Sequence, residues 1–268
     1  MSGSVIHSQS AAMVPAVYSA GQSPQLPVVI DYPAALALRQ MSMVHDELPK
    51  YLLAPEVSAL LHYVPDLRRK MLLATLWNTG ARINEALALT RGDFSLAPPY
   101  PFVQLATLKQ RIEKAARTAG RTPAGQQTHR LVPLSDTWYV SQLQTMVATL
   151  KIPLERRNKR TGRTEKARIW EVTDRTVRTW IGEAVAAAAA DGVTFSVPVT
   201  PHTFRHSYAM HMLYAGIPLK VLQSLMGHKS ISSTEVYTKV FALDVAARHR
   251  VQFAMPESDA VAMLKQLS

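Results

Sequence analysis

Apolar residues recur every three to four positions along most of this chain from residue 55 onward, which predicts a mainly helical protein. Prolines, glycines and small polar residues stand where these helices should begin and end. Pro55 suits a first helical position, for example, and Gly80 suits a helix end. The pattern predicts helices over about 55–64, 66–77, 82–87, 136–149, 173–190, 200–214 and 218–226, and from Ser232 onward.

Two short runs of β-prone residues interrupt this pattern, at 102–105 and 130–134. The stretch between them is polar and basic, so we expect a hairpin with a long cationic connection. Hairpin signals such as Asn-Gly are too sparse for an all-β protein. The predicted fold class is therefore mainly α with a small antiparallel β-sheet, an α+β arrangement.

Weaker patterns occur at the chain ends and in one internal stretch. We expect residues 1–50 to form a largely disordered arm with one short helix near its end, because their first thirty are rich in Ser, Ala, Pro, Gly and Gln. The folded domain then covers 51–268. Within it, residues 153–170 lack an apolar stripe and predict a mobile loop, whereas 259–267 carry an amphipathic stripe and predict a C-terminal helix.

The composition narrows the class of protein. Of the 268 residues, 47% are apolar, which suits one or two globular domains. The absence of cysteine excludes disulfides, zinc–thiolate sites and cysteine nucleophiles. No apolar run approaches the roughly 18 residues of a membrane span, and the N-terminus lacks the apolar region of a signal peptide. We therefore expect a cytoplasmic protein with no membrane partner.

The positive charge is concentrated in two stretches. The formal net charge is +11, of which residues 104–130 carry +5 and residues 151–178 carry +6. One basic run is usually a solvated loop, but two runs that hold all the excess favour a polyanionic partner such as DNA. The residues predicted to contact DNA phosphates are Arg111, Lys114, Arg130, Arg156, Arg157, Lys159 and Arg160.

Side chains suited to phosphate chemistry gather in the C-terminal third. His202 and Arg205 are three positions apart and share a helix face, and Phe204 lies on a different, inward face. We therefore expect Arg205 to reach the surface. His228 follows a helix-ending glycine, and the capping pattern at 232–235 places Tyr237 in the early turns of the next helix.

A second group lies far upstream. Arg82 follows Gly80 at a predicted helix start. Glu85 stands three positions later, where its carboxylate can orient the guanidinium of Arg82 from behind. A guanidinium binds two phosphate oxygens at once and stays protonated, so two arginines can neutralise a phosphodiester without a metal ion. A tyrosine oxygen can attack phosphorus and hold the strand as an ester, which conserves the bond for rejoining.

Each of these residues has a simpler explanation when it is taken singly. A lone tyrosine is usually a half-buried core residue, and Arg82 with Glu85 can be an ordinary surface pair. His202 and His206 have the spacing of a metal pair, but no third ligand stands at a suitable distance in the sequence. We therefore expect no metal and no cofactor, and the joint pattern favours an active site.

Four short stretches resemble the motifs of the tyrosine recombinases, the phage integrase family. Residues 79–87 read TGARINEAL, like the box around the first catalytic arginine. Residues 201–206 read PHTFRH, like the second box. Residues 225–230 read LMGHKS, and 234–237 read TEVY, like the third box with its nucleophile. Any one box is a weak signal, but four in this order are specific, and they span about residues 51–245.

The resemblance implies a role for each matching residue in a 3′-phosphotyrosine mechanism. Tyr237 attacks phosphorus, while Arg82 and Arg205 hold the scissile phosphate. His202 helps to deprotonate the tyrosine, His228 donates a hydrogen bond to the phosphate, and Glu85 supports Arg82. The hairpin lysine that protonates the leaving oxygen is Lys109, with Lys114 as the alternative.

The resemblance also implies partners and leaves alternatives open. The partner is double-stranded DNA at a specific recombination site, bound by a homotetramer in the synapse, in a bacterial cytoplasm. Only about fifty residues precede the catalytic part, as in short members such as plasmid multimer resolvases. A nicking-closing enzyme like the type IB topoisomerases shares the chemistry, and a DNA-binding regulator is the remaining alternative.

Overall fold

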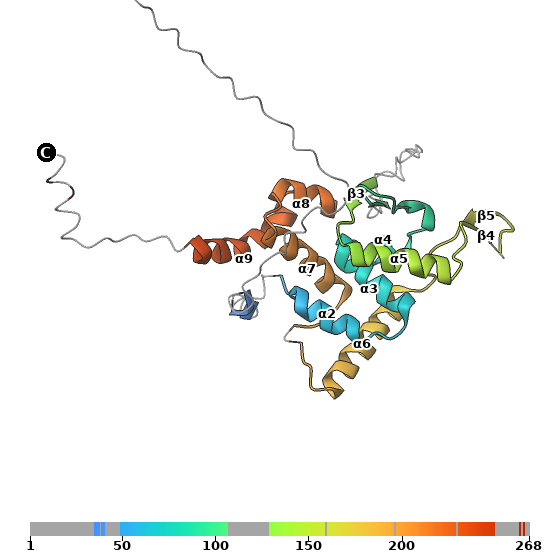
Figure 1. The fold of residues 1–268 in the computed structure, drawn as a ribbon, viewed down its shortest axis with the longest axis horizontal. Helices are drawn as coiled ribbons and strands as arrows, with labels where there is room; N and C mark the ends of the chain where they lie inside the picture. The colour runs from blue at the N-terminus through green and yellow to red at the C-terminus, as the bar shows by residue number, and fades with distance from the viewer. Residues whose placement is uncertain are drawn as a thin grey trace, which may run out of the picture.

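The structure is a computed structural model that describes residues 35–37, 39–40, 49–106, 129–158, 160–195, 197–228 and 230–249, with residues 263 and 265. Helices make up most of it (Figure 1). In chain order they are α2 (Ala54–His62), α3 (Leu67–Thr79), α4 (Ile83–Leu87), α5 (Thr137–Thr149), α6 (Asp174–Ala190), α7 (Pro201–Tyr214), α8 (Leu219–Met226) and α9 (Ser232–His249). Each helix predicted between residues 55 and 226, and the helix predicted from Ser232 onward, is present within a few residues of its expected bounds.

A small antiparallel sheet accompanies the helices. A 3-10 turn at Arg91–Asp93 leads into β1 (Phe94–Ser95), which pairs with β2 (Phe102–Ala106), and β2 pairs with β3 (His129–Pro133). Alternate side chains of β2 and β3 are buried, as the period of a half-buried strand requires. The predicted α+β fold class is confirmed. The connection between β2 and β3 lies outside the described residues.

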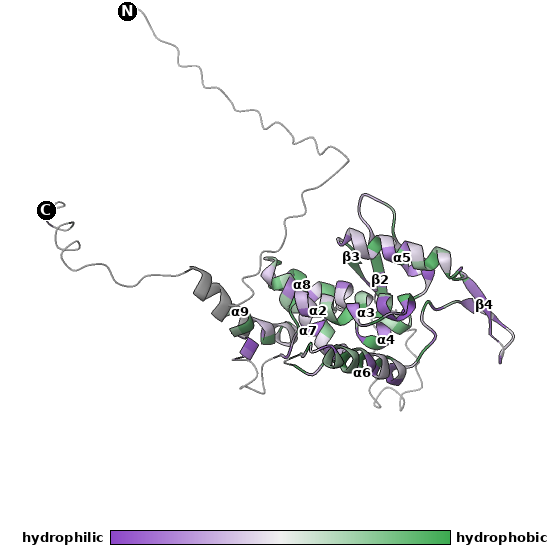
Figure 2. Cartoon of the chain, turned by 60° about the horizontal axis from the view of Figure 1, so that its bottom comes forward, coloured by the Kyte–Doolittle hydropathy of each residue, from purple (hydrophilic) through white to green (hydrophobic). Residues whose placement is uncertain are grey.

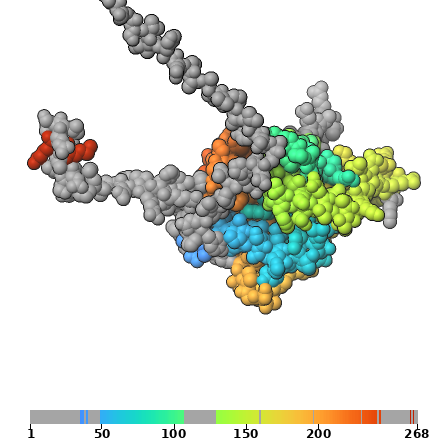
Figure 3. Space-filling view, in the orientation of Figure 1, coloured from blue at the N-terminus to red at the C-terminus, as the bar shows by residue number. Residues whose placement is uncertain are grey.

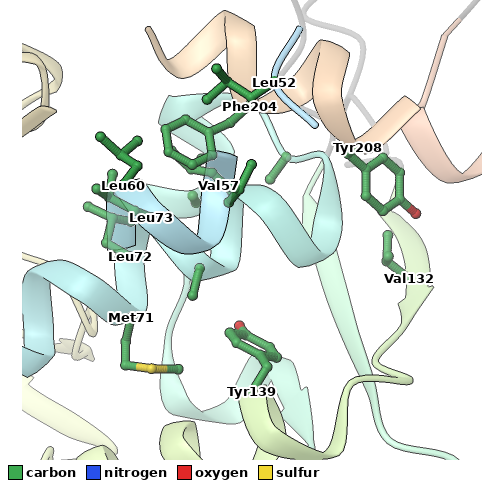
Figure 4. Close-up of a cluster of buried hydrophobic side chains, with 14 of the residues drawn as sticks. Leu52, Val57, Leu60, Met71, Leu72, Leu73, Val132, Tyr139, Phe204 and Tyr208 are labelled. Carbon is green, nitrogen blue, oxygen red and sulfur yellow. The ribbon is translucent and has the colours of Figure 1, made fainter. Parts of the chain in front are cut away.

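The core is built around α3, which packs against α7 and α5. Figure 4 shows side chains of these helices in one cluster, among them Leu72, Phe204 and Tyr139. The Tyr139 hydroxyl shares a hydrogen bond of 2.7 Å with Thr75, so this buried phenol has a polar partner.

The end of α3 explains how distant motifs come together. Gly80 terminates the helix in the left-handed conformation with a φ of 58°. A Cβ at this position would lie 2.3 Å from Cδ1 of Tyr208, so only glycine lets α7 approach so closely. The chain then turns directly into α4, which brings the first arginine motif beside the second.

The prediction of a loop over 153–170 is wrong for much of that stretch. It holds a second hairpin, β4 (Glu155–Arg157) and β5 (Thr164–Lys166), and Ile169 and Trp170 are buried beyond it. The hairpin projects from the body and is hydrophilic (Figures 1 and 2). Because its strands bury no face, they carry no apolar alternation by which sequence could reveal them.

Part of the predicted N-terminal arm contributes to the folded body. Residues 35–37 and 39–40 are helical, Ala35 and Arg39 are buried, and Arg39 pairs with Glu56 of α2. The rest of 1–48 lies outside the described residues, as does most of the predicted helix over 259–267. Within the part of the chain that the structure describes, no helix has the length and apolar character to cross a membrane.

Candidate active site

Arg205, in the early turns of α7, lies at the centre of a polar cluster. Thr200 caps this helix by accepting the N–H of Thr203, which fixes where the helix starts. The Arg205 side chain is buried, with 4% of the residue exposed, and donates to the carbonyl oxygens of Gly80 and, at 2.6 Å, Met226. The expected route to the surface is therefore wrong: the guanidinium joins the ends of α3 and α8.

The charge of Arg205 survives this burial. Burial and then the positive charge of Arg82 lower the pKa of Arg205 to about 10, which still leaves the guanidinium protonated at neutral pH. A cation held in place by carbonyl oxygens needs little reorganisation to receive an anion. The site is therefore electrostatically prepared for a phosphate.

Glu85 connects two further arginines to this cluster. It accepts from the N–H of Arg82 at 2.9 Å and from Nη1 of Arg82 at 3.1 Å. Its Oε2 also accepts from Nη2 of Arg130 at 2.7 Å. Only 2% of Glu85 is exposed. The contact between Glu85 and Arg82 that the motif predicts is thus present, and Arg130 completes it from the other side.

Arg130 does not have the surroundings expected of a residue that contacts DNA. Only 8% of it is exposed, and besides Glu85 it donates through Nε to the carbonyl oxygen of Leu225 at 2.7 Å. The prediction failed because β3 alternates faces: Arg130 points inward, while its neighbour Leu131 is exposed. Arg130 is a bridge between β3, α4 and the end of α8.

The ionisation of Glu85 depends on this bridge. Burial alone raises the pKa of Glu85, but the hydrogen bond and charge of Arg130, together with the backbone N–H and charge of Arg82, outweigh burial and hold the pKa below its usual value. Glu85 is therefore a carboxylate at neutral pH, and it can orient the guanidinium of Arg82.

We predict that Arg130→Met lowers the free energy of unfolding by about 3–5 kcal/mol, because it leaves the Glu85 carboxylate buried without its main partner. The matched control is Arg82→Met, which removes the partially exposed partner of the same carboxylate and should change stability by about 1 kcal/mol or less. Denaturant unfolding of both variants measures the difference.

The pH dependence provides an internal check on that prediction. Because the pKa of Glu85 is lowered on folding, its stabilising contribution is present above its unfolded pKa of 4.5 and is lost as the pH falls below that value. The loss in the free energy of unfolding caused by Arg130→Met should therefore become smaller at acidic pH. If the two variants lost equal stability, or if the loss caused by Arg130→Met did not change with pH, Arg130 would not be the main partner of the Glu85 carboxylate.

His228 is presented at the C-terminal edge of α8. Gly227 ends that helix with a φ of 64°, and a Cβ there would lie 3.0 Å from Nη1 of Arg130. The Nδ1 of His228 shares a hydrogen bond of 2.8 Å with Thr234 Oγ1 of α9. Burial, followed by the charges of Arg205 and other arginines, lowers the pKa of His228 to about 4, so the ring is neutral.

Tyr237 occupies the early turns of α9, as the motif predicts. The helix begins at Ser232, and the carbonyl oxygen of Ile231 accepts the N–H of Glu235 at 2.9 Å, one residue before the predicted cap. Only 2% of Tyr237 is exposed. Burial raises its pKa to about 12, against the opposing charges of Arg205 and Arg82. Tyr237 therefore shares one electrostatic environment with both motif arginines.

The histidine in contact with this tyrosine is His206. Its Nδ1 lies 2.9 Å from the Tyr237 hydroxyl oxygen. His202, which the resemblance assigns to the tyrosine, is exposed, and its ring centre is 6.3 Å from that of His206. In the sequence, His206 stands out only as half of a possible metal pair with His202. The sequence signal that could have indicated this contact is the position of His206, next to Arg205 and one helical turn after His202.

The remaining predicted site residues divide into two groups. Lys109, Arg111, Lys114 and Lys159 lie outside the described residues. In the β4–β5 hairpin, Arg157 and Arg160 are exposed, as predicted. Arg156 instead forms ion pairs with Glu165 across the hairpin and with Glu171. Among the residues that the structure describes, no three His, Asp or Glu side chains cluster as metal ligands.

Comparisons with known proteins show the family. The sequence model described as the phage integrase family matches residues 50–243. A curated protein named Resolvase, from Escherichia coli strain K12, is 96% identical over 268 residues, which is 100% of both chains. The tyrosine recombinase XerD of Mycobacterium leprae is 33% identical over 202 residues, covering 72% of this chain and 57% of that protein.

Solved structures support the fold. The XerH site-specific recombinase in a post-cleavage complex with a palindromic difH substrate aligns with a TM-score of 0.53 at 19% identity. The alignment covers 76% of this chain and 53% of the XerH chain, so this chain spans about half of that structure.

Proposed function

The chain belongs to the phage integrase family of tyrosine-type site-specific recombinases, and on that premise we propose that it cleaves and rejoins DNA through a 3′-phosphotyrosine at Tyr237. The observation that carries the proposal is the convergence at Tyr237. Its hydroxyl is hydrogen-bonded to a histidine, and the charges of Arg205 and Arg82 both act on it.

The proposed reaction exchanges one phosphoester for another. The Tyr237 oxygen attacks phosphorus as the bond from phosphorus to the 5′ oxygen breaks, and the strand stays attached through its 3′ phosphate. Arg82 and Arg205 neutralise the non-bridging oxygens, and His228 donates a hydrogen bond to one of them. Lys109 gives a proton to the leaving 5′ oxygen. The reverse attack by a 5′ hydroxyl restores the DNA and releases Tyr237.

The proposed substrate is double-stranded DNA at a specific recombination site, and the proposed biological reaction is the resolution of plasmid multimers or cointegrates. Two findings support it: a nearly identical relative is named Resolvase, and the XerH structure of the same fold holds a difH substrate. Exchange between two sites requires four subunits for four strands, so we propose a homotetramer in the synapse.

The test is a closed circular DNA that carries two directly repeated copies of a candidate site. A recombinase should convert it into two circles, whereas a nicking-closing enzyme like the type IB topoisomerases would only relax it, and a DNA-binding regulator would do neither. A circle with one site is the control and should yield no smaller product. Relaxation without resolution would reject the proposed function.

The exposed cations of the β4–β5 hairpin are proposed to bind phosphates rather than bases. The hairpin lies at one side of the molecule (Figure 3), and its exposed cations include Arg157, Arg160 and Arg163. Since contacts to phosphates position a protein without reading sequence, these residues should add affinity but little selectivity.

We predict that replacing these three arginines by glutamine weakens binding to cognate and random duplexes alike. Each lost phosphate contact should flatten the slope of log affinity against log salt by about 0.9. The matched control is Arg156→Gln, since Arg156 already neutralises Glu165 and Glu171 and should change the slope less. A changed ratio of cognate to random affinity at constant slope would show that the hairpin reads bases.

A further inference from the structure

A histidine that none of the motif assignments uses makes the hydrogen bond to the nucleophile. His206 lies on α7, directly after Arg205, and is half-buried. Its Nδ1 is 2.9 Å from the Tyr237 hydroxyl oxygen, and the two rings are 5.7 Å apart at an angle of 58°. The contact joins α7 to α9, two helices that pack against each other.

We propose that His206 is a further catalytic residue, the base that takes the proton of Tyr237 through Nδ1. The inference rests on the proposed function, since it concerns the same nucleophile. In the forward step the Tyr237 O–H bond breaks and its proton joins Nδ1. The phenol oxygen bonds to phosphorus, and the 5′ oxygen departs with the proton that Lys109 gives it. In the reverse step His206 returns that proton to the phenol oxygen.

The geometry favours His206 over the other histidines as this base. A general base must lie within about 2.6–3.2 Å of the oxygen whose proton it takes, and His206 meets this requirement. His228 uses its Nδ1 for Thr234 instead. His202 is exposed, and its ring centre lies 6.3 Å from that of His206.

The electrostatics are consistent with a base that acts only during the reaction. Burial, then the charges of His202 and Arg205, lower the pKa of His206 to about 4, so its ring is neutral and one nitrogen is free to accept. Burial raises the pKa of Tyr237 to about 12, so the resting phenol keeps its proton. As the oxygen bonds to phosphorus it loses basicity, and the proton then passes to the nitrogen already in contact.

The experiment separates a proton acceptor from a group that merely holds the phenol. His206→Asn keeps a hydrogen-bonding atom near the place of Nδ1 but cannot accept the proton, whereas His206→Ala removes both functions. Single-turnover cleavage of a nicked DNA that traps the covalent complex gives the rate, and DNA affinity and thermal unfolding report folding. Both variants should cleave about 10²–10⁴-fold more slowly with DNA affinity nearly unchanged.

Two further arms complete the test. Added imidazole should restore part of the rate of His206→Ala, and more basic imidazoles should restore more. His202→Asn is the competing variant, and it should slow cleavage less than His206→Asn. A near-normal rate for His206→Asn, or the reverse order of the two asparagine variants, would overturn the proposal.

The proposed function fails separately from this inference. If the wild-type protein forms no covalent complex, or if Tyr237→Phe still forms one, the nucleophile itself is misassigned. If the wild type forms the complex and Tyr237→Phe does not, the behaviour of the His206 variants tests the base alone.

Discussion

A Tyr237→Phe variant should form no covalent complex with DNA and yet bind DNA with nearly wild-type affinity. The substitution removes only the phenol oxygen, which is the atom proposed to attack phosphorus. The arginines that would hold the phosphate keep their partners. Arg205 still donates to two carbonyl oxygens, and Arg82 still donates to the Glu85 carboxylate. The expected loss is complete because no other group can form the ester at that position.

The measurement is a denaturing gel of labelled DNA, on which a covalent complex survives, together with binding measured under native conditions. Tyr139→Phe is the matched control, since it also removes a buried hydroxyl with one hydrogen bond, in this case to Thr75 of α3. It should retain the covalent complex. A denaturant-resistant complex in Tyr237→Phe would place the nucleophile elsewhere.

Lys109→Ala should slow strand cleavage by about 10²–10⁴-fold, the range expected for loss of a general acid. The reason is the leaving group: a 5′ alkoxide departs poorly unless it receives a proton in the transition state. Lys109, three positions after the last residue of β2, is the lysine proposed for this role. The same change at Lys114, the alternative donor in the same connection, should have a much smaller effect.

A chemical substitution in the DNA identifies the donor directly. A 5′-bridging sulfur leaves without protonation, so cleavage of such a strand should be nearly as fast with Lys109→Ala as with the wild type. The Lys114→Ala variant should gain nothing specific from the sulfur. Rescue confined to Lys114→Ala would transfer the role of general acid to Lys114.

Local signals in the sequence were sufficient for the helices that the structure describes from residue 54 to residue 249. Helix ends depend on residues close in the chain: Asp66 and Thr200 cap α3 and α7, and Gly80 and Gly227 end α3 and α8 in left-handed conformations. These effects act within a turn or two and are therefore readable without a fold. The family motifs are equally local, so residues 201–206 carry the resemblance without any tertiary contact.

The partners of the polar side chains were decided by tertiary structure. Arg130 was expected at the DNA surface, yet it binds Glu85 and the carbonyl oxygen of Leu225, on elements far from β3 in sequence. The hairpin over 155–166 was missed because strands that bury nothing leave no apolar alternation.

The same limit applies to the base proposed for Tyr237. His202 and His206 are one helical turn apart on α7, and the sequence offers both to a tyrosine more than thirty residues away. Only the packing of α7 against α9 places His206, and not His202, at the phenol. By itself the sequence determined the helices and the fold class, because these depend on periodicity and on neighbouring residues. Which group touches which was decided by the packing of distant elements, because a hydrogen bond or ion pair depends on fractions of an ångström between atoms that the chain does not connect locally.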